Sequence, residues 1–164
     1  MALKNYRTEV APEKTAAEIL LRLTRYGARE VTQEFDGDGQ LAGLHFAIET
    51  KHGRQSFRLP ARWQSVQALL KQQLADGVTG LGPRHTTAAH ARAVAWRLLR
   101  DWIDVQLALI DVGMVAMEEA MLPYMILPET GETLYEAFVE RGVPRAAVES
   151  GANVIALPAP RRNR

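Results

Sequence analysis

The residues best suited to chemistry in this chain are four histidines and a group of closely spaced carboxylates. His85 and His90 are five positions apart, off the i,i+4 spacing that places two ligands on one helix face, so we expect no metal site. Asp101 and Asp104 have the types needed for acid/base work or magnesium binding, but no third group of that chemistry joins them. Their pattern favours a solvated helix face.

Other catalytic and cofactor signatures are not found in the sequence. No nucleophile elbow, phosphate loop or dinucleotide-binding motif occurs, and Gly37-Asp38-Gly39 falls in a predicted turn with no helix start behind it. The chain has no cysteine, which excludes disulfides, thiol nucleophiles and cysteine-ligated metals. We expect no cofactor and no small-molecule substrate, and binding or assembly is favoured over catalysis.

Charge is strongly segregated along the chain, although the formal net charge is only +1. Residues 50–100 contain nine basic residues and one acid, whereas residues 101–140 contain nine acids and neither Lys nor Arg. Charge placement governs steering and partner choice rather than fold. The segregation is therefore the main functional clue in the sequence.

The hydrophobic pattern predicts one α+β domain over residues 1–142, with a sheet part in 1–60 and a helical part in 61–142. We expect a strand at residues 4–10, a helix from Pro12 to Gly27, and then an antiparallel meander. The meander strands are expected at residues 31–35, 41–49 and 54–59. Leu44, Phe46 and Ile48 share one face of the second strand, and Phe57 and Leu59 share one face of the third.

Helices are expected to follow the sheet. The second begins at Pro60 and ends at Asp76-Gly77, and a long one extends from Thr86 or Thr87 to about Met121. Because that helix would be longer than a small domain is wide, it either kinks near Gly113 or projects. A last helix is expected at residues 132–140, docked through Leu134, Tyr135 and Phe138, before a flexible tail at 143–164 that contains proline and arginine.

Basic residues on the polar face of the third strand and on the second helix predict a contact with DNA or RNA, because phosphate neutralisation dominates such binding. The predicted nucleic-acid-binding residues are Lys51, Arg54, Arg58, Arg62 and Lys71. Trp63 and Trp96 are interpreted as core residues, with base stacking as the alternative. The helix–sheet–helix order matches double-stranded RNA-binding domains, but the second helix lacks their opening basic cluster, so that assignment is not adopted.

The long helix has its charges in the opposite order to that favoured by its macrodipole, with arginines first and acids last. An antiparallel homodimer explains this order, because Arg92 would face Asp111 of the second chain and Arg97 would face Asp104. The predicted interface residues are Arg92, Arg97, Asp101, Trp102, Asp104 and Asp111. Two alternatives are that the helix packs on the protein's own sheet and that the acidic segment mimics a nucleic-acid backbone.

The Leu122-Pro123 pair ends the long helix, and the two residues after it have two interpretations. Tyr124 and Met125 either fold back onto the core or form an exposed partner anchor. The first ten residues have no apolar core of signal-peptide length, and the most apolar run, 105–117, contains Gln106 and Asp111. We therefore expect a cytoplasmic protein with no membrane segment.

Several short segments resemble a group of short, uncharacterised proteins seen in phage, prophage and mobile-element sequences. They include Ala95-Trp96-Arg97 with Asp101-Trp102, the run Gln106-Leu107-Ala108-Leu109-Ile110, and Leu122-Pro123-Tyr124-Met125. The resemblance covers most of the first 140 residues and implies a phage-related setting. It implies no activity and no site residue.

Overall fold

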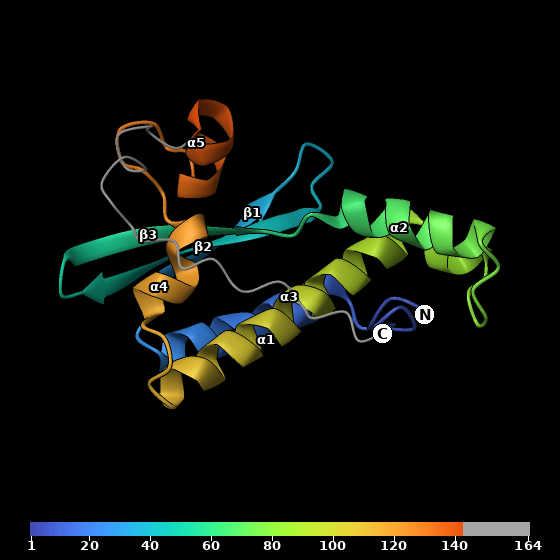
Figure 1. The fold of residues 1–164 in the computed structure, drawn as a ribbon, viewed down its shortest axis with the longest axis horizontal. Helices are drawn as coiled ribbons and strands as arrows, with labels where there is room; N and C mark the ends of the chain where they lie inside the picture. Colours follow the sequence, from blue (N-terminus) through green and yellow to red (C-terminus); the bar gives the residue numbers. More distant parts are fainter. Residues whose placement is uncertain (143–164) are drawn as a thin grey trace, which may run out of the picture.

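The computed structural model describes residues 1–142 as an α+β arrangement of one sheet and several helices (Figure 1). The α+β class predicted from the sequence is confirmed. The elements in chain order are α1 (Pro12–Arg25), β1 (Arg29–Phe35), β2 (Leu41–Thr50), β3 (Gly53–Pro60), α2 (Trp63–Ala75), the 3₁₀ turn η1 (Pro83–Thr86), α3 (Ala88–Asp111), α4 (Met117–Met121), the 3₁₀ turn η2 (Leu122–Tyr124) and α5 (Leu134–Arg141).

The strand predicted at residues 4–10 is wrong. Residues 4–7 form a turn, in which Asn5 has a φ of 64° and the Thr8 amide donates to the Asn5 carbonyl at 2.9 Å. The segment is held by helices instead of strands, because the Leu3 amide donates to the Gln73 side chain at 3.1 Å. An alternating pattern is not sufficient for a strand when no neighbouring strand supplies the ladder.

The predicted antiparallel meander is confirmed, with strand order β1-β2-β3. Phe46 pairs with Phe57 and Leu44 with Leu59 across β2 and β3, so the apolar side chains of both strands share one face. The β1–β2 turn is fixed by the Asp36 carboxylate, which accepts hydrogen bonds from the Asp38 and Gln40 amides. Short polar turns of this kind set the register of both hairpins.

The main core lies between the apolar face of the sheet and two helices, α1 and α3, which run side by side on that face (Figure 1). Ile19 and Leu23 from α1 and Trp96 from α3 are fully buried there. The second helix, α2, packs on the N-terminal half of α3 around a smaller cluster of Leu70, Ala91 and Val94.

The helix predicted over residues 86–121 is interrupted. The Thr87 side chain caps α3 by accepting from the His90 amide, as expected, but α3 ends at Asp111. Gly113 has a φ of 72°, and the Met114 amide returns to the Leu109 carbonyl at 2.9 Å, which closes the helix end. Of the two predicted outcomes, a kink near Gly113 or a projecting helix, the structure therefore shows an interruption near Gly113.

The segment after η2 meets the edge of β3 at one isolated bridge, between Phe57 and Met125. The Ile126 amide donates to the Ser56 carbonyl and the Leu134 amide donates to the Met125 carbonyl, both at 2.8 Å. Helix α5 then stands on the side of the sheet opposite α1 and α3 (Figure 1). The tail predicted at 143–164 lies outside the described residues.

Candidate binding surface

The predicted nucleic-acid-binding residues are spread over β3, its preceding turn and α2. Lys51, Arg54, Arg62 and Lys71 are exposed, and Arg58 is half-buried. Arg54 forms an ion pair with Glu30, and Arg58 forms one with Glu136 of α5. The Arg62 guanidinium lies over the Tyr135 ring, 5.3 Å from its centroid. The two arginines of the β3 face are therefore paired with carboxylates within the chain.

Glu136 fastens α5 to the outer face of the sheet. Its carboxylate accepts a hydrogen bond from the Thr133 amide at 2.8 Å, and the Thr133 side chain accepts one from the Glu136 amide at 3.2 Å. The backbone hydrogen bond from Thr133, followed by the Thr133 side chain and Arg58, holds the pKa of Glu136 below its ordinary value despite burial. A charged Glu136 thus caps α5 and anchors Arg58.

Helix α5 differs from its predicted packing. We expected Leu134, Tyr135 and Phe138 to dock on the core, but Tyr135 is 44% exposed and Phe138 51% exposed. The helix buries the small residue Ala137 instead, because capping and the Arg58 ion pair fix its rotation. The sequence did contain a signal, since the apolar residues of α5 are too many for one narrow face.

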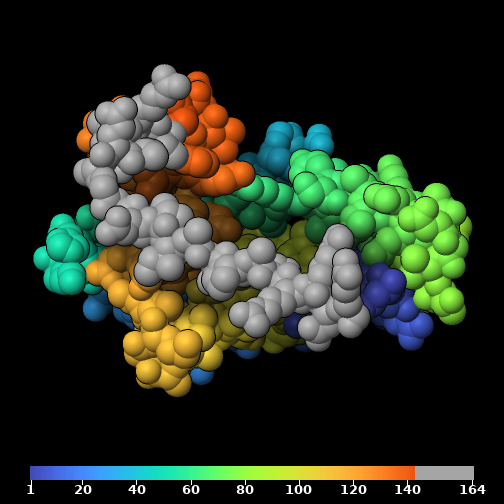
Figure 2. Space-filling view, in the orientation of Figure 1, coloured from blue at the N-terminus to red at the C-terminus, as the bar shows by residue number. Residues whose placement is uncertain are grey.

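These side chains form a continuous apolar surface with η2, which we call the α5 surface. Its residues are Leu122, Pro123, Leu134, Tyr135, Phe138 and Val139. Leu122 is 45% exposed and Val139 63% exposed, and all but Val139 line an apolar hollow of about 320 Å³. In the space-filling view α5 (orange-red) stands at one edge of the molecule (Figure 2).

Charged side chains of both signs border the α5 surface. Residues 117–142 contain six glutamates and one arginine. Glu132 and Glu140 line a wider hollow of about 700 Å³ beside Tyr135 and Val139. Arg141 pairs with both, at 2.9 Å to Glu132 and 3.9 Å to Glu140. Arg58 lines the same hollow, so carboxylates and arginines together border the exposed apolar groups. Because Glu132 and Glu140 share one arginine, a ligand with apolar groups and an added cation fits this edge.

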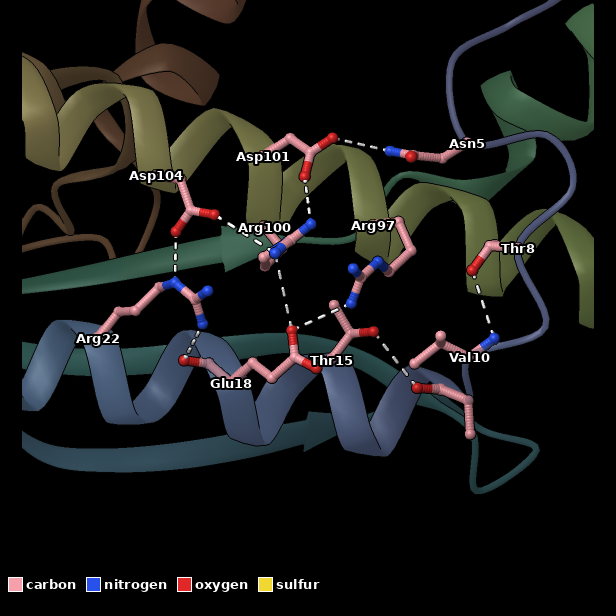
Figure 3. Close-up of polar contacts among 11 residues, drawn as sticks. Asn5, Thr8, Val10, Thr15, Glu18, Arg22, Arg97, Arg100, Asp101 and Asp104 are labelled. Carbon is pink, nitrogen blue, oxygen red and sulfur yellow. Dashed lines mark hydrogen bonds and ion pairs between the residues drawn. The ribbon is translucent and has the colours of Figure 1, made fainter.

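The charged stripe of α3 pairs with α1 and with the N-terminal segment (Figure 3). Arg97 contacts Glu18 at 3.0 Å, and Arg22 pairs with Asp104. Arg100 lies 2.7 Å from Asp101, 3.5 Å from Asp104 and 4.0 Å from Glu18. The three acids thus converge on one guanidinium.

The N-terminal segment supplies the remaining partners of Asp101. Lys4 lies 2.8 Å from the Asp101 carboxylate, and the Asn5 side-chain amide donates to it at 2.9 Å. Burial acts to raise the pKa of Asp101, but the hydrogen bonds from Lys4 and Asn5 and the charge of Arg100 outweigh it and hold the pKa low. Asp101 therefore ties the first residues of the chain to α3.

The unusual charge order of α3 is matched by α1. Glu18 lies beside Arg97 and Arg22 beside Asp104, so the two helices run parallel. Helix α1 has an acid in its first turn and arginines in its last, the order that its macrodipole favours. Because α3 has its arginines first and its acids last, each end of α3 lies beside residues of opposite charge on the parallel helix α1. Arg97 and Asp104, which the sequence paired with each other across two chains, instead pair with Glu18 and Arg22 of the same chain.

The other predicted interface residues also have partners in the chain. Arg92 lies over the Trp63 ring, 4.3 Å from its centroid, and 3.5 Å from Asp36. Asp111 accepts a hydrogen bond from the Tyr26 hydroxyl, which raises the pKa of that tyrosine. An antiparallel dimer through these residues stays a prediction.

Tyr124 and Met125 are half-buried and pack against the main core. The Tyr124 ring meets Trp102 edge-on at 5.3 Å, and Met125 pairs with Phe57 in a single β-bridge. The segment therefore folds back, as the first of the two interpretations expected. The neighbouring Leu122 is the more exposed residue, although the sequence gave it no role beyond ending the helix.

The histidines have structural contacts. His90 and the carbonyl of Tyr6 lie 2.6 Å apart, and the Gly82 amide donates to His85 at 2.9 Å. Burial, then the charges of Arg84 and His90, lowers the pKa of His85. Within residues 1–142 no three His, Asp or Glu side chains are placed to hold a metal ion.

Comparison of the chain with protein-family models, curated proteins and solved structures finds no significant match. In the part of the chain that the structure describes, no helix is both long enough and apolar enough to cross a membrane.

Proposed function

We propose that this chain is a protein-interaction protein that binds a peptide segment of its partner on the α5 surface. The observation that supports this is the exposure of Tyr135, Phe138 and Val139 on one short helix, at 44, 51 and 63%. Contiguous exposed apolar side chains rimmed by polar groups are typical of interaction sites. Aromatic residues are also the commonest hot spots of such interfaces.

The rim of the surface indicates the chemistry of the partner. Glu132 and Glu140 border the surface and share Arg141, whereas Arg58 is already paired with Glu136 of α5. A matching segment has apolar side chains that fill the hollow and arginines or lysines that face the carboxylates. Complementary charge of this kind raises the association rate and selects against acidic segments.

Phe138→Asp is expected to weaken peptide binding about 30-fold, because a carboxylate at the centre of an apolar contact costs roughly 2 kcal/mol. Peptides are selected from a random displayed library on the wild-type chain, and their affinities are measured by fluorescence polarisation. Leu21→Asp is the matched control, since Leu21 is 60% exposed on α1. Selected peptides that bind the Phe138 variant as tightly as the wild type, or a library with no enriched peptide, would contradict the proposal.

Contact with single-stranded nucleic acid is the second candidate function. It is favoured by Arg62, which is exposed and stacked on Tyr135, and by the exposed Lys51 and Lys71. Exposed aromatic rings beside cations are the parts that single-strand binders use. Arg54 and Arg58 add less to this candidate, because each already faces a carboxylate.

Replacing Lys51, Arg62 and Lys71 together by glutamine is expected to reduce the slope of log affinity against log salt by about 2, since each phosphate contact on a single strand contributes about 0.7. Filter binding to single-stranded DNA and RNA over a range of salt measures the slope. Lys14→Gln on α1 serves as the control for loss of one positive charge away from this surface. An unchanged slope in the triple variant, or no binding by the wild type at low salt, would remove this candidate.

A further inference from the structure

The α5 surface lies next to the point where the described part of the chain ends. Helix α5 ends at Arg141, Gly142 follows with a φ of 72°, and the sequence continues through residues 143–164. The continuation therefore starts one residue from the helix that bears the exposed Phe138 and Val139. Any ligand group in that continuation is tethered to the surface.

The sequence of this continuation has the chemistry that the α5 surface fits. An apolar run, Val154-Ile155-Ala156-Leu157, is followed by Pro158 and then by three arginines at 161, 162 and 164. The apolar run matches the hollow of Leu122, Tyr135 and Phe138, and the arginines can face Glu132 and Glu140 of the neighbouring hollow. Residues 143–164 contain four arginines and one acid, opposite in sign to residues 117–142.

We propose that the α5 surface is the docking site of residues 154–164 of the same chain, which occupy it as a built-in competitor of the partner. This inference rests on the proposed function, because it assigns a second ligand to the same surface. The contact is intramolecular. The apparent affinity for an external peptide is then the affinity of the free surface multiplied by the fraction of molecules in which that surface is free.

The length of the connection permits this contact. Helix α5 has eight residues and is about 12 Å long. The segment between Gly142 and Val154 can span roughly 35–40 Å when extended, so it reaches every part of the surface. A short tether gives an effective concentration of about 1 mM. Even a weak contact is then populated within one chain, while contacts between chains at micromolar concentration are far rarer.

Paramagnetic broadening tests the contact in the full chain. The sequence has no cysteine, so Ala159→Cys accepts a single nitroxide label. Backbone amides of Tyr135, Phe138 and Val139 are expected to lose at least about half of their NMR signal, and the Leu21 amide on α1 none. Adding Ile155→Asp and Leu157→Asp should restore the α5 signals, because the apolar run can no longer fill the hollow. No broadening at α5, or broadening that survives both changes, would overturn the proposal.

A mixed sample identifies the chain that supplies the segment. Labelled chains without ¹⁵N are mixed with ¹⁵N chains that lack the nitroxide, and no broadening at α5 is expected. Broadening in the mixture equal to that in the single-chain sample would mean that a second copy supplies the segment, against the proposal.

The partner assay separates this inference from the proposed function. With the tail changes Ile155→Asp and Leu157→Asp, peptides selected on the wild-type chain are expected to bind at least twofold more tightly, because the competitor is removed. Unchanged peptide affinity would refute the competition and leave the proposed function standing. Broadening at α5 without any selectable peptide would refute the proposed function, while the tail contact itself would stand.

Discussion

Trp96→Ala is expected to lower the free energy of unfolding by about 3–5 kcal/mol, the range observed when a buried aromatic side chain is truncated. Trp96 is fully buried between α3 and the sheet, among Ile103, Leu44 and Phe57. Its indole nitrogen also donates to the Leu41 carbonyl, at 3.4 Å. The substitution therefore removes the largest side chain of the core and one hydrogen bond. Urea denaturation followed by circular dichroism measures the loss.

Two further variants make this result interpretable. Trp96→Phe keeps most of the volume and should cost about 1–3 kcal/mol, which gives a measurable transition if the alanine variant does not fold. Leu21→Ala, at a side chain that is 60% exposed, should change stability by less than about 0.5 kcal/mol. A Trp96→Ala protein as stable as the wild type would contradict the buried position of this residue and would return Trp96 to the surface, where base stacking had been the alternative.

Helix and strand positions could be predicted from the sequence wherever one periodic stripe faces one core. Trp96 was interpreted from its helical position as a core residue, and Phe57 and Leu59 alternate along their strand; all three are buried in the main core. A break near Gly113 was one of two outcomes that the sequence left open, and glycine favours it because it adopts the left-handed conformation that closes a helix. These features depend on local residue types and on a single burial direction.

The orientation of α5 could not be predicted in the same way. Its rotation is set by the ion pair between Glu136 and Arg58, which are far apart in the sequence. Apolar residues alone suggested that Tyr135 and Phe138 would be buried, whereas the capping box and this ion pair leave them exposed. The candidate site was missed because a short helix with apolar residues on two sides does not indicate which side faces the core.

The charge pattern was read correctly as a pairing signal, but the sequence did not reveal that α1 supplies partners within the chain. The reversed order of charges on α3 requires a neighbour with complementary order, and an antiparallel copy of α3 meets that requirement as well as a parallel α1 does. Only the fold, which places Glu18 and Arg22 beside α3, identifies the intramolecular partners. Charge complementarity gives the chemistry of a partner and not its identity.

Arg100→Gln is expected to lower the free energy of unfolding by roughly 2–3 kcal/mol at neutral pH. The Arg100 side chain is 21% exposed and faces Glu18, Asp101 and Asp104, so its removal leaves three carboxylates with less compensating charge. This decrease in the free energy of unfolding is smaller than for a fully buried ion pair, because each of the three acids keeps a second cation. In addition, the buried Nε of Arg100 has no hydrogen-bond partner among the described residues, so removing it breaks no hydrogen bond at that atom. Arg100→Lys, which keeps the charge but not the forked donor, should lose about half as much.

The difference in the free energy of unfolding between the wild type and Arg100→Gln should depend on pH if it is electrostatic and not if it comes from packing. Because the folded chain holds the pKa of Asp101 below its ordinary value, the stability from this carboxylate is present above that value and is lost as pH falls. Without Arg100 the pKa depression is smaller, so wild type and variant should converge as pH falls through about 4. Lys14→Gln on the exposed side of α1 should leave stability unchanged. A difference that stays constant with pH would indicate packing, and one that grows with protein concentration over a roughly hundredfold range would indicate an interface between two chains.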